Sequence, residues 1–121
     1  MDGAIFSDSQ QVLAYAQLRG LYNALVFQVK KDFTRVNLSL AIVGCPESKQ
    51  LQALITEKIY LLLMERFPDY LNVMYAVDIP ERAFKHIEMT DTVDVAEQVT
   101  FLILSRELQK VELKEKYRSK D

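Results

Sequence analysis

The chain has little glycine and proline, with three of each in 121 residues. A many-stranded β-sandwich needs far more turn residues, so this composition argues against that class of fold. Half of the residues are hydrophobic, which excludes an intrinsically disordered chain. An apolar chain with few turn residues favours helices, and its length suits a single domain.

Cysteine is almost absent, because Cys45 is the only one. No internal disulfide and no cysteine-rich zinc site can form, and a reducing compartment suits such a chain. Its apolar runs, such as YLLLM at 60–64, fall far short of the ~20 residues of a membrane-spanning helix. The start, MDGAIFSDSQ, lacks the basic region and apolar run of a secretory signal. We therefore expect a cytoplasmic protein with no membrane contact.

No excess of positive charge marks the chain, which has 15 basic and 17 acidic residues. The last predicted helix does carry Arg106, Lys110, Lys114 and Lys116, but neighbouring glutamates offset them, so nucleic-acid binding is not favoured. The motifs GxGxxG, GxxxxGK[ST] and GxSxG are missing. We expect no cofactor and no metal.

The stretch SDSQ at Ser7–Gln10 has the spacing of a capping box and predicts the start of a helix. Apolar residues then recur every three or four positions, which extends this helix to about Lys31. Gly20 lies inside it, and we interpret Gly20 as a point of close approach for a neighbouring helix.

The segment from Phe33 to Gly44 is ambiguous. Apolar residues alternate from Val36 to Ile42 as in a strand, but those at 33, 36, 40 and 43 also share one helical face. Gly44 and Pro46 resemble a helix end followed by a helix start, so we predict a helix. The alternative is an α+β fold with short strands near 36–43 and 73–79.

A central helix is predicted from Glu47 to about Phe67, where Pro68 stops it and a short helix begins. In the motif DIPE, Asp78 suits a cap for another short helix, from Pro80 to about Ile87. Asp91 suits the cap of the last helix.

The expected architecture is an all-α irregular bundle of about three long and two or three short helices, forming one domain over 1–121. The segments LYNALVFQVKKDF (21–33) and IYLLLMERFPDY (59–70) resemble each other. This echo suggests an internal duplication of halves at about 8–46 and 47–90, although shared rules of helix termination explain it equally well.

Two side chains are weak candidates for a ligand site. Cys45, between Gly44 and Pro46 at a predicted helix start, could be a reactive thiol, but an isolated cysteine is more often a small buried side chain. His86 lies near several carboxylates, yet no second histidine accompanies it. No catalytic residue is predicted.

The apolar faces of the helices are broad enough to exceed what a small core needs. We therefore expect a non-enzymatic interaction or regulatory module that forms a homo-oligomer, with another protein partner as a further option. The alternative is a small-molecule binder or enzyme with a pocket between helices. The interface candidates are Tyr15, Tyr22, Leu104, Leu108 and Val111.

The stretches FPDYLNVMYAVDIPERAF (67–84) and LILSRELQKVELKEKY (102–117) resemble a group of small bacterial proteins. That group shares an Asp-aromatic pair, a YxxDxxE junction and a last helix of REXQK type. The resemblance covers about half of the chain. It implies an all-helical fold and no assigned activity or site residue.

Overall fold

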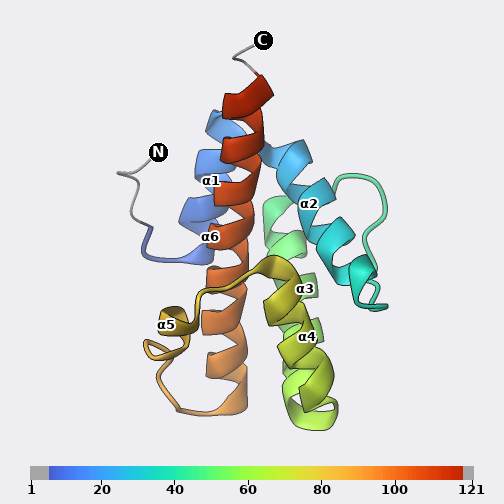
Figure 1. Cartoon of the computed structure of the whole chain (residues 1–121), viewed down its shortest axis with the longest axis vertical. Helices are drawn as coiled ribbons and strands as arrows, with labels where there is room; N and C mark the ends of the chain where they lie inside the picture. Colours follow the sequence, from blue (N-terminus) through green and yellow to red (C-terminus); the bar gives the residue numbers. More distant parts are fainter. Residues whose placement is uncertain (1–5, 119–121) are drawn as a thin grey trace.

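A computed structural model describes residues 6–118 and shows only helices and loops within them (Figure 1). The all-α prediction is confirmed, and the α+β alternative is wrong because 73–77 are helical and 36–43 form no strand. The helices are α1 (Ser9–Leu18), α2 (Tyr22–Arg35), α3 (Ser48–Glu65), α4 (Phe67–Val77), α5 (Glu81–Phe84) and α6 (Thr92–Arg118).

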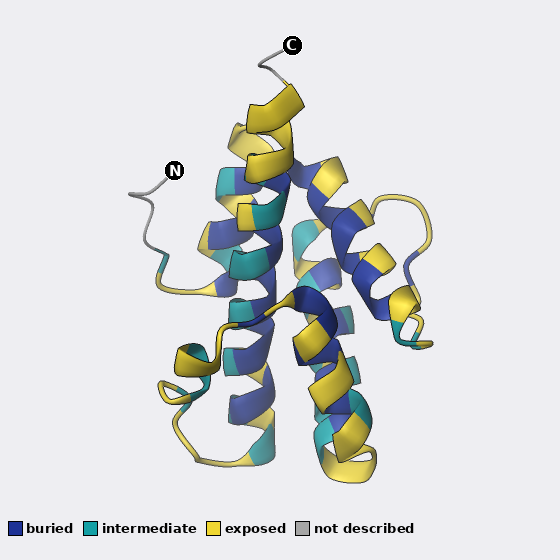
Figure 2. Ribbon diagram, in the orientation of Figure 1, coloured by how far each residue is buried: buried dark blue, intermediate teal, exposed yellow. Residues whose placement is uncertain are grey.

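The long helix α6 organises the bundle. It packs against α1, α2, α3 and α4, whereas α3 packs mainly against α6, α4 and α1 (Figure 1). The helix that touches the most neighbours is therefore the last one, and not the 47–67 helix that the sequence suggested. Buried positions recur along α6 from Val95 to Val111, and its last turns are exposed (Figure 2).

The first helix starts with a cap shifted by one residue from the prediction. Asp8, not Ser7, accepts a hydrogen bond from the amide of Gln11 at 2.9 Å. The Gln11 side chain in turn accepts a bond from the amide of Ser7 at 2.7 Å. Asp8 thus caps α1, while the Gln11 side chain bonds the amide of the residue before the cap and not the cap amide of a regular capping box.

The predicted continuous helix to Lys31 is wrong, because the helix is interrupted between Leu18 and Tyr22. Gly20 has a φ of +71°, and the amide of Leu21 bonds to the carbonyl of Ala16 at 2.8 Å. Gly20 thus ends α1, since glycine adopts the left-handed conformation without a Cβ penalty. It is not a contact point, because a Cβ at this position would meet nothing within 4 Å.

The predicted helix over 33–44 is wrong beyond Arg35. Asn37 takes a φ of +64°, and the amide of Leu38 bonds to the carbonyl of Phe33 at 3.1 Å, which closes the end of α2. The following loop, residues 36–47, is held by the buried side chains of Leu40 and Ile42. Alternating apolar residues here anchor a loop.

The junctions around α4 follow from local chemistry. Pro68 lies in the first turn of α4, where a proline costs no hydrogen bond. Asp78 has a φ of +71° and ends α4, so it does not cap the next helix as predicted. The predicted cap at Asp91 is confirmed, since its Oδ1 accepts from the amide of Asp94 at 2.8 Å.

The buried apolar side chains of all the long helices form one connected core. Phe33 of α2 and Ile55 of α3 are among the largest fully buried side chains. No helix in residues 6–118 is both long and apolar enough to span a membrane. The proposed duplication of halves stays a prediction.

Candidate functional site

Helix α4 has an apolar face turned to solvent. Phe67, Leu71 and Tyr75 follow at four-residue spacing and are 51%, 42% and 85% exposed. Residues four apart lie on one side of a helix, so these side chains form a continuous row, which we call the α4 stripe. The Phe67 ring lies 5.2 Å from the ring of Tyr70, and the outer side of the row is open to solvent.

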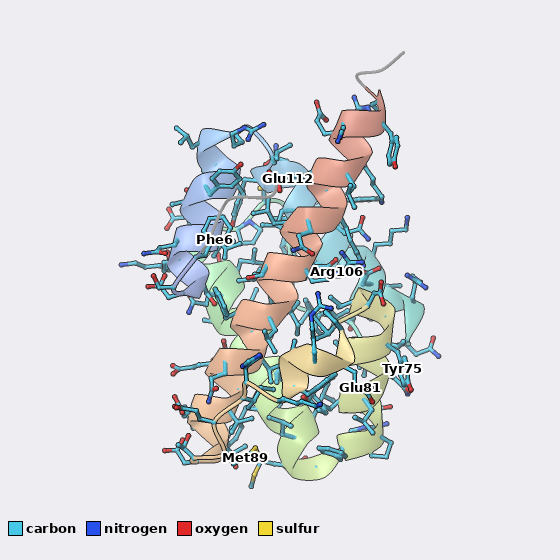
Figure 3. All side chains as sticks on the ribbon, turned by 60° about the vertical axis from the view of Figure 1, so that its left-hand side comes forward. Phe6, Tyr75, Glu81, Met89, Arg106 and Glu112 are labelled. Atoms are coloured by element: carbon cyan, nitrogen blue, oxygen red, sulfur yellow. The ribbon has the colours of Figure 1, made fainter. Side chains whose placement is uncertain are left out.

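A groove lies beside the α4 stripe and shares two of its residues. Leu71 and Tyr75 line a cavity of about 570 Å³ whose other apolar walls come from the end of α4 and from α5. We call it the α4 groove, and its remaining apolar lining residues are Met74, Ile79, Pro80 and Phe84. Figure 3 shows Tyr75 pointing outward at its edge, with Glu81 of α5 nearby.

Two tyrosines of α4 show that this helix is packed on one side only. Tyr70 is 5% exposed, and burial raises the pKa of its phenol. Tyr75, five residues later, is on the solvent side. A large aromatic ring left in water is a common feature of protein interaction surfaces.

A buried charged cluster lies behind the end of α4. Asp32 of α2 and Glu107 of α6 are completely buried. The Nζ of Lys110 lies 2.5 Å from Asp32 Oδ2 and 3.1 Å from Glu107 Oε1. The same ammonium donates to the carbonyl of Val77 at 3.1 Å. One lysine therefore joins α2, α6 and the end of α4.

The two buried carboxyl groups differ in protonation. Burial and the adjacent Asp32 carboxylate raise the pKa of Glu107 to about 9. Burial alone would raise the pKa of Asp32 as well, but hydrogen bonds from Glu107, Lys110 and Gln28 lower it. At neutral pH Glu107 is thus protonated, and the ionised Asp32 balances Lys110.

Polar side chains at the margin complete this cluster. Gln28 donates to Asp32 Oδ1 at 3.2 Å and accepts from Lys114 at 2.6 Å. Arg35 lies 3.2 Å from Asp32 on the exposed side. The two carboxyls have no solvent exposure, and the cluster connects α2, α6 and the end of α4.

Cys45 lies in the 36–47 loop and is exposed. Its Sγ is 2.9 Å from Oδ1 of Asn23, and α3 begins only at Ser48. The thiol is therefore outside the first turn of α3, where the sequence had suggested an activating position.

His86 is exposed in the segment after α5 and lines a second cavity with Glu97 and Gln98. Within the described residues, no group of three or more His, Cys, Asp or Glu side chains is arranged to hold a metal ion.

The interface candidates from the sequence lie mainly inside the chain. Tyr15 is half-buried and donates to Glu112 at 3.1 Å, and Tyr22 donates to the carbonyl of Pro46 at 2.5 Å. The three residues of the last helix are buried in the core: Leu104, Leu108 and Val111. These inward-facing side chains belong to the fold of one chain, and the exposed apolar surface is elsewhere.

Sequence reasoning missed both the α4 stripe and the buried carboxyls, although signals existed. Phe67, Leu71 and Tyr75 have helical spacing, but Tyr70 and Met74 do too, and the pattern does not say which row is inside. Glu107 stands in the inward register of α6, between Leu104 and Val111. A carboxyl at an inward position is the pattern that predicts a buried acid.

No protein-family model, curated protein or solved structure matches the chain significantly.

Proposed function

We propose that the protein is a non-enzymatic interaction module that forms a homodimer through the α4 stripe and the α4 groove, in the cytoplasm. The main support for this proposal is that Tyr75 and Phe67 are exposed in one row beside an apolar groove. An exposed apolar row rimmed by polar residues is typical of a protein contact surface.

The second copy of the chain is the occupant that this surface fits. A twofold dimer uses the same patch on both subunits, so the patch must be complementary to itself. Here a ridge and a groove lie side by side and share Leu71 and Tyr75. Rotation by 180° places the ridge of each copy against the groove of the other, as in helix packing by ridges and grooves.

Charges at the rim are also self-complementary. Glu81 of α5 is exposed, and its neighbours Arg82 and Lys85 are exposed cations. A short segment that carries both signs pairs favourably with an antiparallel copy of itself.

The surface is smaller than a standard stable interface, so we expect a weak dimer. The stripe and groove expose on the order of 500 Å² of apolar area per chain, given 150–250 Å² for a whole aromatic side chain. A standard stable interface buries ~800 Å² per partner. We therefore expect a reversible dimer with a dissociation constant in the range of ~10–100 μM.

A dilution series, monitored through the amide chemical shifts in NMR spectra, tests the location of this interface. Between about 1 mM and about 10 μM protein, we expect shifts to change in α4 and α5 and not in α1. The variant Tyr75→Ser should show no such change. Dilution-dependent shifts centred on another helix, or unchanged shifts in the wild type, would overturn the proposal.

A further inference from the structure

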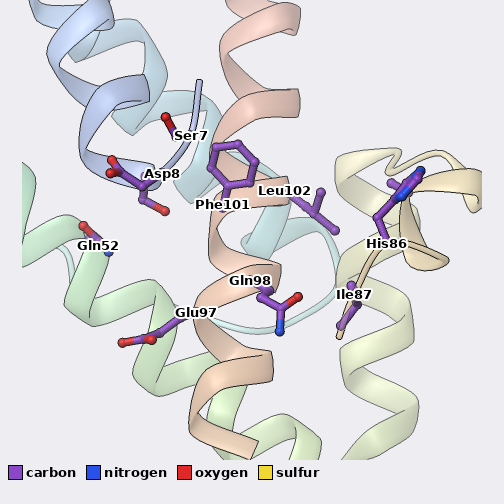
Figure 4. A pocket seen from close by; sticks show the side chains of 11 residues that line it. Ser7, Asp8, Gln52, His86, Ile87, Glu97, Gln98, Phe101 and Leu102 are labelled. Atoms are coloured by element: carbon purple, nitrogen blue, oxygen red, sulfur yellow. The ribbon is translucent and has the colours of Figure 1, made fainter. Parts of the chain in front are cut away.

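The cavity beside His86 lies between the start of α1, helix α3, the segment around α5 and the middle of α6 (Figure 4). Its volume is about 410 Å³, which lies in the range of small-molecule sites. It is separate from the α4 groove, because the two share no lining residue.

The lining of this cavity is divided into two parts. In Figure 4, Asp8, Gln52 and Glu97 lie on one side of the Phe101 ring, and Leu102 and Ile87 lie on the other. The first part offers carboxylate and amide oxygens, and the second combines these apolar side chains with the imidazole of His86. A ligand that fills both needs one polar end and one apolar body.

The charge of the lining is of one sign at the polar end. Asp8 and Glu97 contribute carboxylates, His86 lines the other part, and no lysine or arginine of residues 6–118 lines the cavity. The Glu97 side chain makes no hydrogen bond or ion pair with a described residue, so its charge is not neutralised within the part of the chain that the structure covers. These carboxylates favour a cation.

The side chain next to the α1 cap adds a hydroxyl to the lining. Ser9 lines the cavity and is only 3% exposed. Its hydroxyl forms no hydrogen bond with another described residue, and it is not among the fully buried polar atoms that lack a partner, so it is accessible to a ligand or to water. A ligand amine or its bound water would provide a partner.

Phe101 supplies the surface on which such a ligand would rest. It is half-buried in α6 and lies between the polar and the apolar parts (Figure 4). An aromatic face attracts an ammonium group and also packs against an apolar ring. We propose that this cavity is a binding site for a small organic cation, an amine with an aromatic or alkyl body, held by Glu97 and Asp8 and packed on Phe101.

Titration with 2-phenylethylamine, followed by amide chemical shifts, tests the proposal, with 2-phenylethanol as the uncharged analogue. We expect the amine to bind in the range of ~0.1–1 mM, to shift residues around Phe101, and to bind at least about fivefold more tightly than the alcohol. The variant Glu97→Gln should weaken the amine about threefold or more and leave the alcohol unchanged.

Glu57→Gln is the matched control, because Glu57 is also an exposed carboxylate but lies outside this cavity. It should leave binding of the amine unchanged. Equal binding of amine and alcohol, equal effects of the two variants, or no binding at about 10 mM amine would overturn the proposal. Because Glu97 is exposed, its replacement leaves the fold intact, and a loss of binding reports on the site.

Discussion

The ammonium of Lys110 in α6 lies 2.5 Å from the carboxylate of Asp32 in α2, and Asp32 is completely buried. Lys110 also donates to the carbonyl of Val77, just before the groove residue Ile79. The pair therefore ties the end of α4, beside the α4 groove, to α2 and α6. An internal ion pair positions the surface that we propose for self-association.

Replacing Lys110 by methionine should destabilise the fold, because it leaves the Asp32 charge buried without its main partner. We expect the free energy of unfolding to fall by about 3–5 kcal/mol, as when one member of a buried pair is removed. Arg35→Ala is the control, since Arg35 meets the same carboxylate from an exposed position and should cost less than about 1 kcal/mol. Urea denaturation at pH 7 measures both, and equal losses would contradict the assigned role of Lys110.

Glu107 gives the stability a distinct pH dependence. Its pKa is 4.5 in a solvated carboxyl and about 9 in the folded chain. Between these values the folded state holds one more proton than the unfolded state, so the contribution of Glu107 is complete below pH 4.5 and is lost as the pH rises toward 9. The free energy of unfolding should fall by up to ~1.4 kcal/mol per pH unit in this window.

The variant Glu107→Gln removes the ionisable carboxyl and keeps the shape of the side chain. Relative to the wild type, it should gain about 3 kcal/mol between pH 6 and pH 8. Denaturation of both proteins at the two pH values measures the difference. Parallel behaviour of the two proteins would show that Glu107 is already ionised in the folded chain.

Core and surface positions should respond differently to truncation. Leu108→Ala removes a buried side chain and should cost about 2–5 kcal/mol. Tyr75→Ala removes a side chain that is 85% exposed and should change the stability of the monomer by no more than about 0.5 kcal/mol. Thermal unfolding at low protein concentration compares them. A large loss for Tyr75→Ala would mean that its ring supports the fold and not a contact between chains.

The sequence predicted the fold class and several helix boundaries because capping and turn chemistry are local. Asp91 caps α6 and Pro68 opens α4 as their residue types suggested. The break at Gly20 was missed, because the apolar periodicity continues through it in both helices. The environment of Asp32 could not be predicted, since its partners Glu107 and Lys110 are more than 70 positions away and meet it only after folding.

Gly20 tests the role of backbone conformation at the end of α1. Its φ of +71° strains any residue with a Cβ, although the space around it is open. Gly20→Val should cost about 1–2 kcal/mol, and Gly20→Asn should cost less because asparagine tolerates this conformation better. The difference between the two variants, measured by urea denaturation, isolates the backbone effect. Equal stabilities would contradict the helix break at this glycine.

The most direct test of self-association through α4 is the mass of the protein in solution. Light scattering measures this mass at protein concentrations from about 5 μM to about 500 μM. We predict that the mass rises from the 14.0 kDa of one chain toward twice that value, and that Tyr75→Ser stays at the mass of one chain. Leu18→Ser removes an 84% exposed side chain at the end of α1, away from α4, and should dimerise like the wild type. A wild type that remains at 14.0 kDa throughout, or a Tyr75→Ser variant that dimerises as well as Leu18→Ser, would contradict self-association through α4.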